Sequence, residues 1–250
     1  MSTYRTPERE DGPDAGHTAL EVEGSPWLRG SFLGRLPAPE RHELLSAGRL
    51  VNFRPGEFLV REGDMTTSVY VLLTGMAKVT VNASSGHTTL LAIRVAGDII
   101  GEMAPIDEAP RSASVAAALP TRAAALTGDA FLKFLGKHPK ASLEMLRTIS
   151  YKLRSATAAR SITGGYPVTA RLAQVLRDLG HAYGKPGDQG LEIHAPLTQA
   201  DLAALVGASQ PAVHKALRTL RDQGAIRTGY RSISIASESA LDEVADSETA

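Results

Sequence analysis

A change of hydrophobic period near residue 127 is the feature that most constrains how this chain can fold. From Arg49 to Leu126 the sequence consists of short β-type runs separated by turns at roughly ten-residue spacing, which is typical of a compact antiparallel sandwich or barrel. The runs Val69–Leu73 and Lys78–Val81 are rich in β-branched residues and alternate as half-buried strands do. From Asp129 the apolar residues recur at helical spacing. The sequence therefore predicts an α+β protein whose N-terminal β domain is followed by helices.

Composition narrows the classes of function. With 250 residues the chain can bury two ordinary cores, and 43% hydrophobic with 22% charged residues is typical of a globular protein. It contains no run of 18 apolar residues and begins without an apolar signal core, so we expect a cytoplasmic protein. The absence of Cys excludes thiolate zinc sites, iron–sulfur clusters and Cys nucleophiles. The seven His show no metal-ligand spacing, so no metal is expected. A haem with a single His as axial ligand remains compatible with the sequence.

The stretch Gly101–Ala113 carries groups suited to a nucleotide. It lies between the β-type runs Leu90–Val95 and Ala113–Leu119. The fork of donors on Arg111 suits a phosphate, and Ser112 with nearby backbone N–H groups can complete the cradle. Glu102 can accept a hydrogen bond from a sugar hydroxyl. The alternative is a surface loop with a structural Arg–Glu pair.

This cassette resembles the phosphate-binding cassette of cyclic-nucleotide-binding domains in the CRP/FNR (cyclic-AMP receptor protein) family of bacterial transcription regulators. The turn sequences between residues 55 and 102 also resemble those of that family's jelly-roll-like β-roll. They are Pro-Gly-Glu, Glu-Gly-Asp, Leu-Thr-Gly, Gly-Asp and Gly-Glu. The resemblance implies that Glu102 holds the ribose 2′-hydroxyl and that Arg111 and Ser112 hold the cyclic phosphate, with Gly101 and Met103 beside them. The implied effector is cyclic AMP, or cyclic GMP. Because the chain contains no Cys, it cannot belong to the members of that family that bind an iron–sulfur cluster through Cys.

Helices are expected on both sides of the β region. Two short ones are predicted over Ser25–Leu33 and Pro39–Ala47. Asp129 can cap a helix that ends at Gly136, and Pro139 opens a longer helix that reaches about Arg160.

The longer helix carries a heptad-like seam with spacings of 3, 4, 3 and 4, formed by Leu143, Leu146, Ser150, Leu153 and Thr157. A plain amphipathic core helix is the alternative. The resemblance implies that this helix forms a homodimer interface and that Thr157 reaches the bound base. Ala156 departs from the family, which has Thr at the matching position, so base selectivity stays open.

A break at Ser161–Pro167 contains Gly164 and Gly165 and predicts a hinge. A further helix is predicted over Val168–Tyr183, a loop over Gly184–Gly190 and a short strand over Leu191–Ile193.

Two helices and a hairpin then follow in a pattern typical of DNA-binding proteins. Thr198 and Asp201 form a capping box whose helix ends at Gly207, and Ser209 caps a second helix that runs to Arg221 with Pro211 in its first turn. A hairpin, Ile226–Ile235, comes next. The layout is that of a helix-turn-helix, in which the second helix enters the major groove. A helical hairpin without DNA contact is the alternative.

The unit from Leu197 to Ile235 resembles the winged helix-turn-helix of the same family. The DNA-binding residues expected from it are Thr198, Gln199, Ser209, Gln210, Ala212, His214, Lys215 and Arg218. Gln can pair with adenine and Lys with guanine, whereas Arg218, Arg227 and Arg231 are expected at phosphates or, alternatively, as solvated surface charges. Gln210 and Pro211 stand where the family usually has Arg and Glu, so its usual half-site does not transfer. Between residues 161 and 236 eight basic residues face five acidic ones, which permits DNA binding.

These observations predict a tail (1–24), a cyclic-nucleotide-binding β-roll (25–137), a dimerisation helix and hinge (138–163), a winged helix-turn-helix (164–236) and a flexible acidic tail (237–250). The expected function is sequence-specific transcription regulation controlled by a cyclic nucleotide, with double-stranded DNA and RNA polymerase as partners. The alternative keeps the fold and the DNA but is ligand-independent or answers another metabolite. An enzyme is not expected, because no Gly-x-Ser-x-Gly elbow, P-loop or paired-carboxylate spacing occurs. For the same reason no catalytic residue is predicted.

Overall fold

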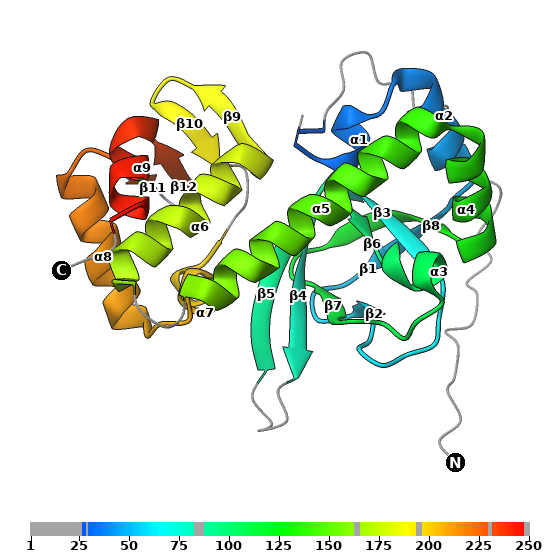
Figure 1. The fold of residues 1–250 in the computed structure, drawn as a ribbon, viewed down its shortest axis with the longest axis horizontal. Coiled ribbons are helices and arrows are strands. Elements are labelled where there is room, and N and C mark those ends of the chain that lie inside the picture. The colour runs from blue at the N-terminus through cyan, green and yellow to red at the C-terminus, as the bar shows by residue number, and fades with distance from the viewer. Residues whose placement is uncertain are drawn as a thin grey trace.

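The computed structural model describes residues 27–28, 30–82, 88–162, 166–193, 197–229 and 232–247, with only the backbone of residues 157–162. The predicted tail over 1–24, the hinge glycines Gly164 and Gly165, and Arg231 at the tip of the hairpin lie outside this part of the chain. The molecule consists of a β-rich N-terminal part and a helical C-terminal part, with one long helix running between them (Figure 1).

Two short helices open the described chain, α1 (Phe32–Arg35) and α2 (Ala38–Ser46). The first lies later than predicted, because Ser31 is its N-cap and accepts a hydrogen bond from the backbone N–H of Gly34 at 3.2 Å. The second agrees with the prediction and has Pro in its first turn.

Two antiparallel four-stranded sheets form the β-roll. One has the order β1-β8-β3-β6, made of β1 (Arg49–Phe53), β8 (Thr121–Leu126), β3 (Val69–Thr74) and β6 (Ile99–Ile100). The other has the order β2-β7-β4-β5, made of β2 (Phe58–Val60), β7 (Ser114–Ala117), β4 (Met76–Asn82) and β5 (Thr88–Val95). Side chains from both sheets share a core that includes Leu59, Leu72 and Val115. The predicted β domain is therefore confirmed.

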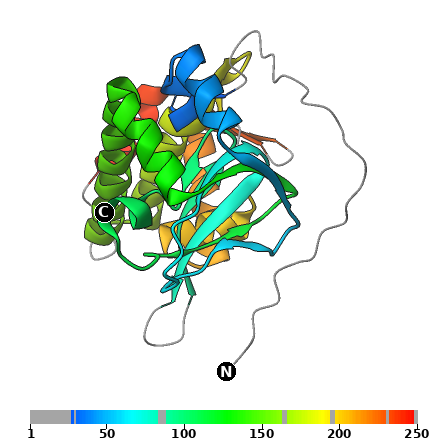
Figure 2. The ribbon, with the colours of Figure 1, turned by 90° about the vertical axis from the view of Figure 1, so that its right-hand side faces the viewer.

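Three further helices accompany the first sheet. α4 (Gly128–Lys137) and α5 (Pro139–Ile162) share a hydrophobic core with it, and α3 (Met103–Asp107), within the predicted cassette, contacts α4. The expected cap and stop of α4 are wrong. Thr127 caps this helix through the backbone N–H of Ala130, and Gly136 lies within the last helical turn. Viewed from the β-roll side, the strands lie in front of the C-terminal helices (Figure 2).

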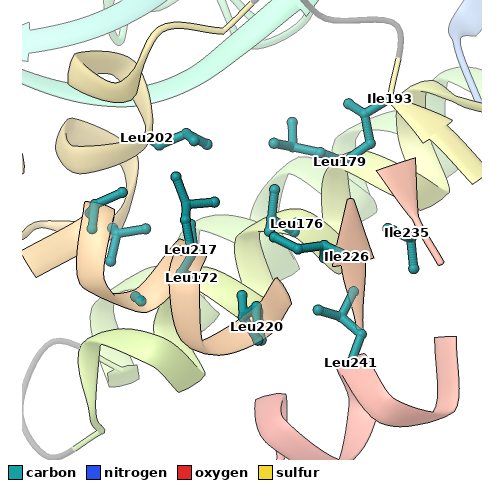
Figure 3. Close-up of a cluster of buried hydrophobic side chains, with 14 of the residues drawn as sticks. Leu172, Leu176, Leu179, Ile193, Leu202, Leu217, Leu220, Ile226, Ile235 and Leu241 are labelled. Atoms are coloured by element: carbon teal, nitrogen blue, oxygen red, sulfur yellow. The ribbon is translucent and has the colours of Figure 1, made fainter. Parts of the chain in front are cut away.

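The C-terminal part surrounds α6 (Val168–Tyr183), whose bounds agree with the prediction. Leu172, Leu176 and Leu179 recur at helical spacing and are buried against the elements that follow (Figure 3). Those elements are β9 (Gly184–Gly187), β10 (Gly190–Ile193), α7 (Gln199–Val206), α8 (Gln210–Asp222), β11 (Ile226–Gly229) and β12 (Ser232–Ile235). The segment predicted as a loop over 184–190 is thus mostly strand, because β9 pairs antiparallel with β10 at the edge of the sheet β11-β12-β10-β9.

The expectation of a flexible tail from residue 237 is also wrong for most of its length. Ser237 caps α9 (Glu238–Ala245) through the backbone N–H of Ala240 at 3.2 Å. Leu241 and Ala245 are buried and pack in the same core as α6. Arg177 of α6 also lies within 3.3 Å of Asp242 and 3.2 Å of Asp246. The apolar face of this short helix outweighs its acidic composition, so the C-terminal unit extends beyond the predicted boundary at residue 236.

Candidate effector and DNA sites

The cassette is shaped by a sharp turn at Gly101, between β6 and α3. Its φ of +81° lies in the left-handed region, which favours glycine. A Cβ built there would lie 2.6 Å from Nη1 of Arg111 and 2.9 Å from the carbonyl oxygen of Ser68. Glycine at this position therefore lets the Arg111 side chain lie directly against the backbone.

Arg111 is buried at 4% exposure and is held by three acceptors. Its Nη1 donates to the carbonyl oxygen of Gly101 at 2.7 Å, Nη2 to that of Ser68 at 2.6 Å, and Nε to Oγ1 of Thr66 at 3.1 Å. Burial lowers the pKa of Arg111, while Tyr70, Glu102 and Asp64 oppose that shift. A guanidinium has five N–H groups, so two remain for a further acceptor such as a phosphate oxygen.

Glu102 is buried at 3% exposure beside Arg111 and binds a lysine from α5. Lys152 Nζ lies 2.8 Å from Oε1 of Glu102 and 3.0 Å from the carbonyl oxygen of Ile99. Burial lowers the pKa of Lys152, and the carboxylate of Glu102 partly offsets this shift. A ligand hydroxyl that binds Glu102 must therefore share the carboxylate with Lys152.

Sequence reasoning missed Lys152, although one signal was present. It lies one helical turn before Ala156, the position expected to approach a base, and residues four apart share a helix face.

The other predicted ligand residues are not buried beside Glu102 and Arg111. Met103 is 41% exposed on α3, and Ser112 is exposed just before β7. The side chain of Thr157 lies outside the described residues. The fold thus brings Gly101, Glu102 and Arg111 together, and their roles toward a ligand stay predictions.

The two helices of the helix-turn-helix are capped as the sequence predicts. Thr198 Oγ1 accepts from the backbone N–H of Asp201 at 3.2 Å, and Asp201 Oδ2 accepts from that of Thr198 at 3.1 Å. Gly207, with φ +65°, ends α7, and Ser209 caps α8 through the N–H of Ala212 at 3.4 Å. The role of Arg171 was not predicted beyond its charge. In the structure its Nη1 donates to the carbonyl oxygens of Val206 at 2.9 Å and Gly207 at 3.3 Å, which holds the turn against α6.

One face of α8 is exposed, and the opposite face is buried. Val213, Ala216, Leu217 and Leu220 are buried beneath the helix. The predicted DNA residues Thr198, Gln199, Ser209, Gln210, His214, Lys215 and Arg218 are exposed, and Ala212 is partly exposed. Arg227 on β11 is exposed as well. The arrangement leaves the polar side of a helix, flanked by a β-hairpin, available to a DNA groove.

Within the described residues, no helix is both long and apolar enough to span a bilayer. In the same part of the chain, no group of three or more His, Asp or Glu side chains is arranged to hold a metal ion.

Comparison with known proteins identifies both halves of the chain. Residues 50–138 match the cyclic nucleotide-binding domain family, and residues 170–244 match the Crp-like helix-turn-helix domain family. A CRP-like cAMP-activated global transcriptional regulator from Mycobacterium tuberculosis is 29% identical over 76% of this chain and 85% of its own length. The cyclic AMP receptor protein of Thermus thermophilus is 26% identical over 87% of this chain and 98% of its own length. The structure of FixK2 from Bradyrhizobium japonicum shares the fold, with a TM-score of 0.68 at 19% identity over 80% of this chain and 98% of that one.

The two domain families occur here in the order and at the positions that the strands, the long helix and the helix-turn-helix define. The Crp-like helix-turn-helix domain is the part of the chain that binds DNA. The chain therefore belongs to the CRP/FNR family of transcription regulators, which are not enzymes.

Proposed function

We propose that this regulator is controlled by a cyclic nucleotide, with cyclic AMP as the first choice and cyclic GMP as the second. The observation that carries the proposal is the placement of Arg111 against Gly101, next to Glu102, because a guanidinium can bind phosphate and a carboxylate can accept a hydrogen bond from a sugar hydroxyl. Ser112 would complete the phosphate contact, and Thr157 with Met103 would lie near the base. The naming of the mycobacterial relative as cAMP-activated supports the choice of cyclic AMP.

The active form in this proposal is a homodimer formed through α5. Leu143, Leu146 and Leu153 are 48%, 62% and 66% exposed, although they lie on one helix at near-heptad spacing. Exposed leucines in such a row are expected to pack against a second copy of the helix. A dimer would present two α8 helices about 34 Å apart, one turn of DNA. Leu146→Glu should then yield monomers in analytical ultracentrifugation, whereas Leu132→Glu, at an equally apolar exposed position on α4, should not.

Effector control requires that the ligand favour one arrangement of the dimer. Shifting an equilibrium from mostly inactive to mostly active takes roughly a 10⁴-fold difference in affinity between the two forms. The activated dimer would bind its operator in the cytoplasm and engage RNA polymerase there.

Calorimetry with cyclic AMP and cyclic GMP tests the effector directly. Arg111→Lys keeps the positive charge but loses the planar fork, so it should weaken nucleotide binding at least tenfold. Arg122→Ala removes an exposed guanidinium from β8 and serves as the control, with unchanged affinity expected. Equal affinity of wild type and Arg111→Lys would show that the cassette does not hold a phosphate.

A second function is favoured by two observations. Ala156 replaces the hydroxyl expected at the base, and Lys152 already binds Glu102. A regulator that is ligand-independent or answers another metabolite would show the same DNA affinity with and without either cyclic nucleotide. Titration of a labelled duplex under the three conditions separates the two functions, because only an effector can change the affinity.

A further inference from the structure

Residues 98–102, here called the β6 segment, are bound at both ends by elements from outside the β-roll. At one end Asp98 Oδ2 accepts a hydrogen bond from the hydroxyl of Tyr183, on α6 of the DNA-binding unit, at 2.9 Å. At the other end Lys152 of α5 binds Glu102 at 2.8 Å. Between them, Lys152 also binds the carbonyl oxygen of Ile99, and Arg111 binds that of Gly101. The five-residue β6 segment therefore contacts Arg111, includes Glu102 and binds Tyr183 of the DNA-binding unit.

The β6 segment is well suited to transmit a displacement. Ile99 and Ile100 are 1% and 3% exposed, and both pair with β3. Close-packed interiors yield little, so a shift at Glu102 or Gly101 moves the whole short segment rather than being absorbed within it.

Arg94 interacts electrostatically with groups at both ends of the segment. Burial alone would lower the pKa of Arg94, but Tyr183, Asp98 and Glu102 raise it overall, so this cation interacts with groups at both ends. Burial, together with Asp98, raises the pKa of Tyr183 well above its usual value. The Tyr183 hydroxyl therefore stays protonated and remains a hydrogen-bond donor to Asp98.

We propose that the β6 segment couples the effector cassette to the DNA-binding unit and that Tyr183 is the positioning residue at the DNA-binding end. This inference rests on the proposed function of the cassette. A ligand hydroxyl that shares Glu102 weakens its ion pair with Lys152, and a phosphate on the two remaining N–H groups of Arg111 weakens the bond from Arg111 to the carbonyl oxygen of Gly101. The hydroxyl of Tyr183 stabilises the arrangement in which Glu102 binds Lys152 alone. Loss of this hydroxyl therefore favours arrangements in which Glu102 can bind a ligand.

Tyr183→Phe tests the coupling with little disturbance of the fold. The buried ring is retained, and both acceptors keep a second donor: Asp98 Oδ2 accepts from the backbone N–H of Val95 at 3.0 Å, and the carbonyl oxygen of Ile93 accepts from Nη1 of Arg94 at 2.7 Å. The affinity for cyclic AMP, measured by calorimetry, should rise roughly two- to tenfold, the effect of one neutral hydrogen bond. The DNA affinity without nucleotide should rise by a similar factor, because linkage ties both to the same equilibrium.

Ser142→Ala is the control. It removes a hydroxyl of α5 that donates to the carbonyl oxygen of Leu135 at 2.7 Å, away from the β6 segment and from α6. Both affinities should stay unchanged. A Tyr183→Phe protein that only melts at a lower temperature, with wild-type affinities for nucleotide and DNA, would reduce Tyr183 to a structural role and overturn the inference.

Failure of the proposed function gives a different result. If the wild-type protein binds no cyclic nucleotide, amide hydrogen exchange on the full chain still tests the segment. Tyr183→Phe should then speed exchange at residues 99–102 and around Lys152, whereas Ser142→Ala should not. Unchanged exchange at those amides in Tyr183→Phe contradicts the coupling.

Discussion

Lys78 Nζ on β4 lies 2.5 Å from Asp201 Oδ1 on α7, so the carboxylate that caps the first helix of the helix-turn-helix also binds the β-roll. Asp201 is buried and additionally accepts hydrogen bonds from the backbone N–H and the hydroxyl of Thr198. Burial alone would raise the pKa of Asp201, but the contacts with Lys78 and Thr198 outweigh it and lower the pKa. One side chain thus joins helix capping to contact between the two units.

This pair predicts a pH dependence of stability on the acid side. A carboxyl whose pKa is lower in the folded than in the unfolded protein stabilises the fold above its unfolded pKa, at about pH 4. That contribution is lost as the pH falls through the folded pKa. Asp201→Asn should therefore lower the melting temperature at pH 7 and flatten its decline below pH 4, as followed by circular dichroism. Asp129→Asn, at an exposed position on α4, is the control, and an identical acid profile for all three proteins would contradict the role of Asp201.

The buried pair of Glu102 and Lys152 predicts a non-additive double mutant. Lys152→Met leaves a carboxylate at 3% exposure without its cation and should cost about 3 kcal/mol in urea unfolding. Adding Glu102→Gln removes the uncompensated charge and should recover much of that loss. If the double variant is as unstable as the sum of the two single variants, the two charges do not interact as the geometry indicates.

Helix α9 predicts a contribution to stability from the C-terminal segment. Leu241 is 1% exposed, so Leu241→Ala should lower the free energy of unfolding by about 2–5 kcal/mol. Glu243→Ala changes an exposed residue of the same helix and should have little effect. Equal unfolding curves for both variants would mean that the helix is not docked in solution.

The exposed face of α8 predicts two kinds of DNA contact. Lys215→Ala at a base should cost about 1–3 kcal/mol and relax sequence preference, whereas Arg218→Ala at a phosphate should weaken binding to all sequences and reduce the salt slope by about 0.9. Lys133→Ala removes one exposed charge from α4 and controls for net charge. Salt-dependent titrations of specific and scrambled duplexes distinguish these outcomes, and no effect of either variant would place the DNA elsewhere.

Features that depend on neighbours in the chain could be predicted from the amino-acid order. Periodicity defined the β-roll and α6, and the caps Thr198 and Ser209 were identified because their partners lie three residues away. Buried Val213 and Leu217 fixed which face of α8 is exposed. Local composition was misleading where packing outweighed it, in the Gly- and Pro-containing strand β9 and the acidic helix α9, and it also misplaced the start of α1 and both ends of α4.

Contacts between groups far apart in the chain could not be predicted in this way. Lys152 binds Glu102 across 50 residues of chain, and Tyr183 binds Asp98 across 85. The sequence predicted that Glu102 and Arg111 belong to a nucleotide cassette, but it did not indicate that protein groups already bind both side chains. Such contacts follow from how the long helix and α6 pack on the β-roll, and spacing along the chain carries no record of that packing. The physical reason is that caps and periods are local, whereas buried charge pairs depend on which surfaces the fold brings together.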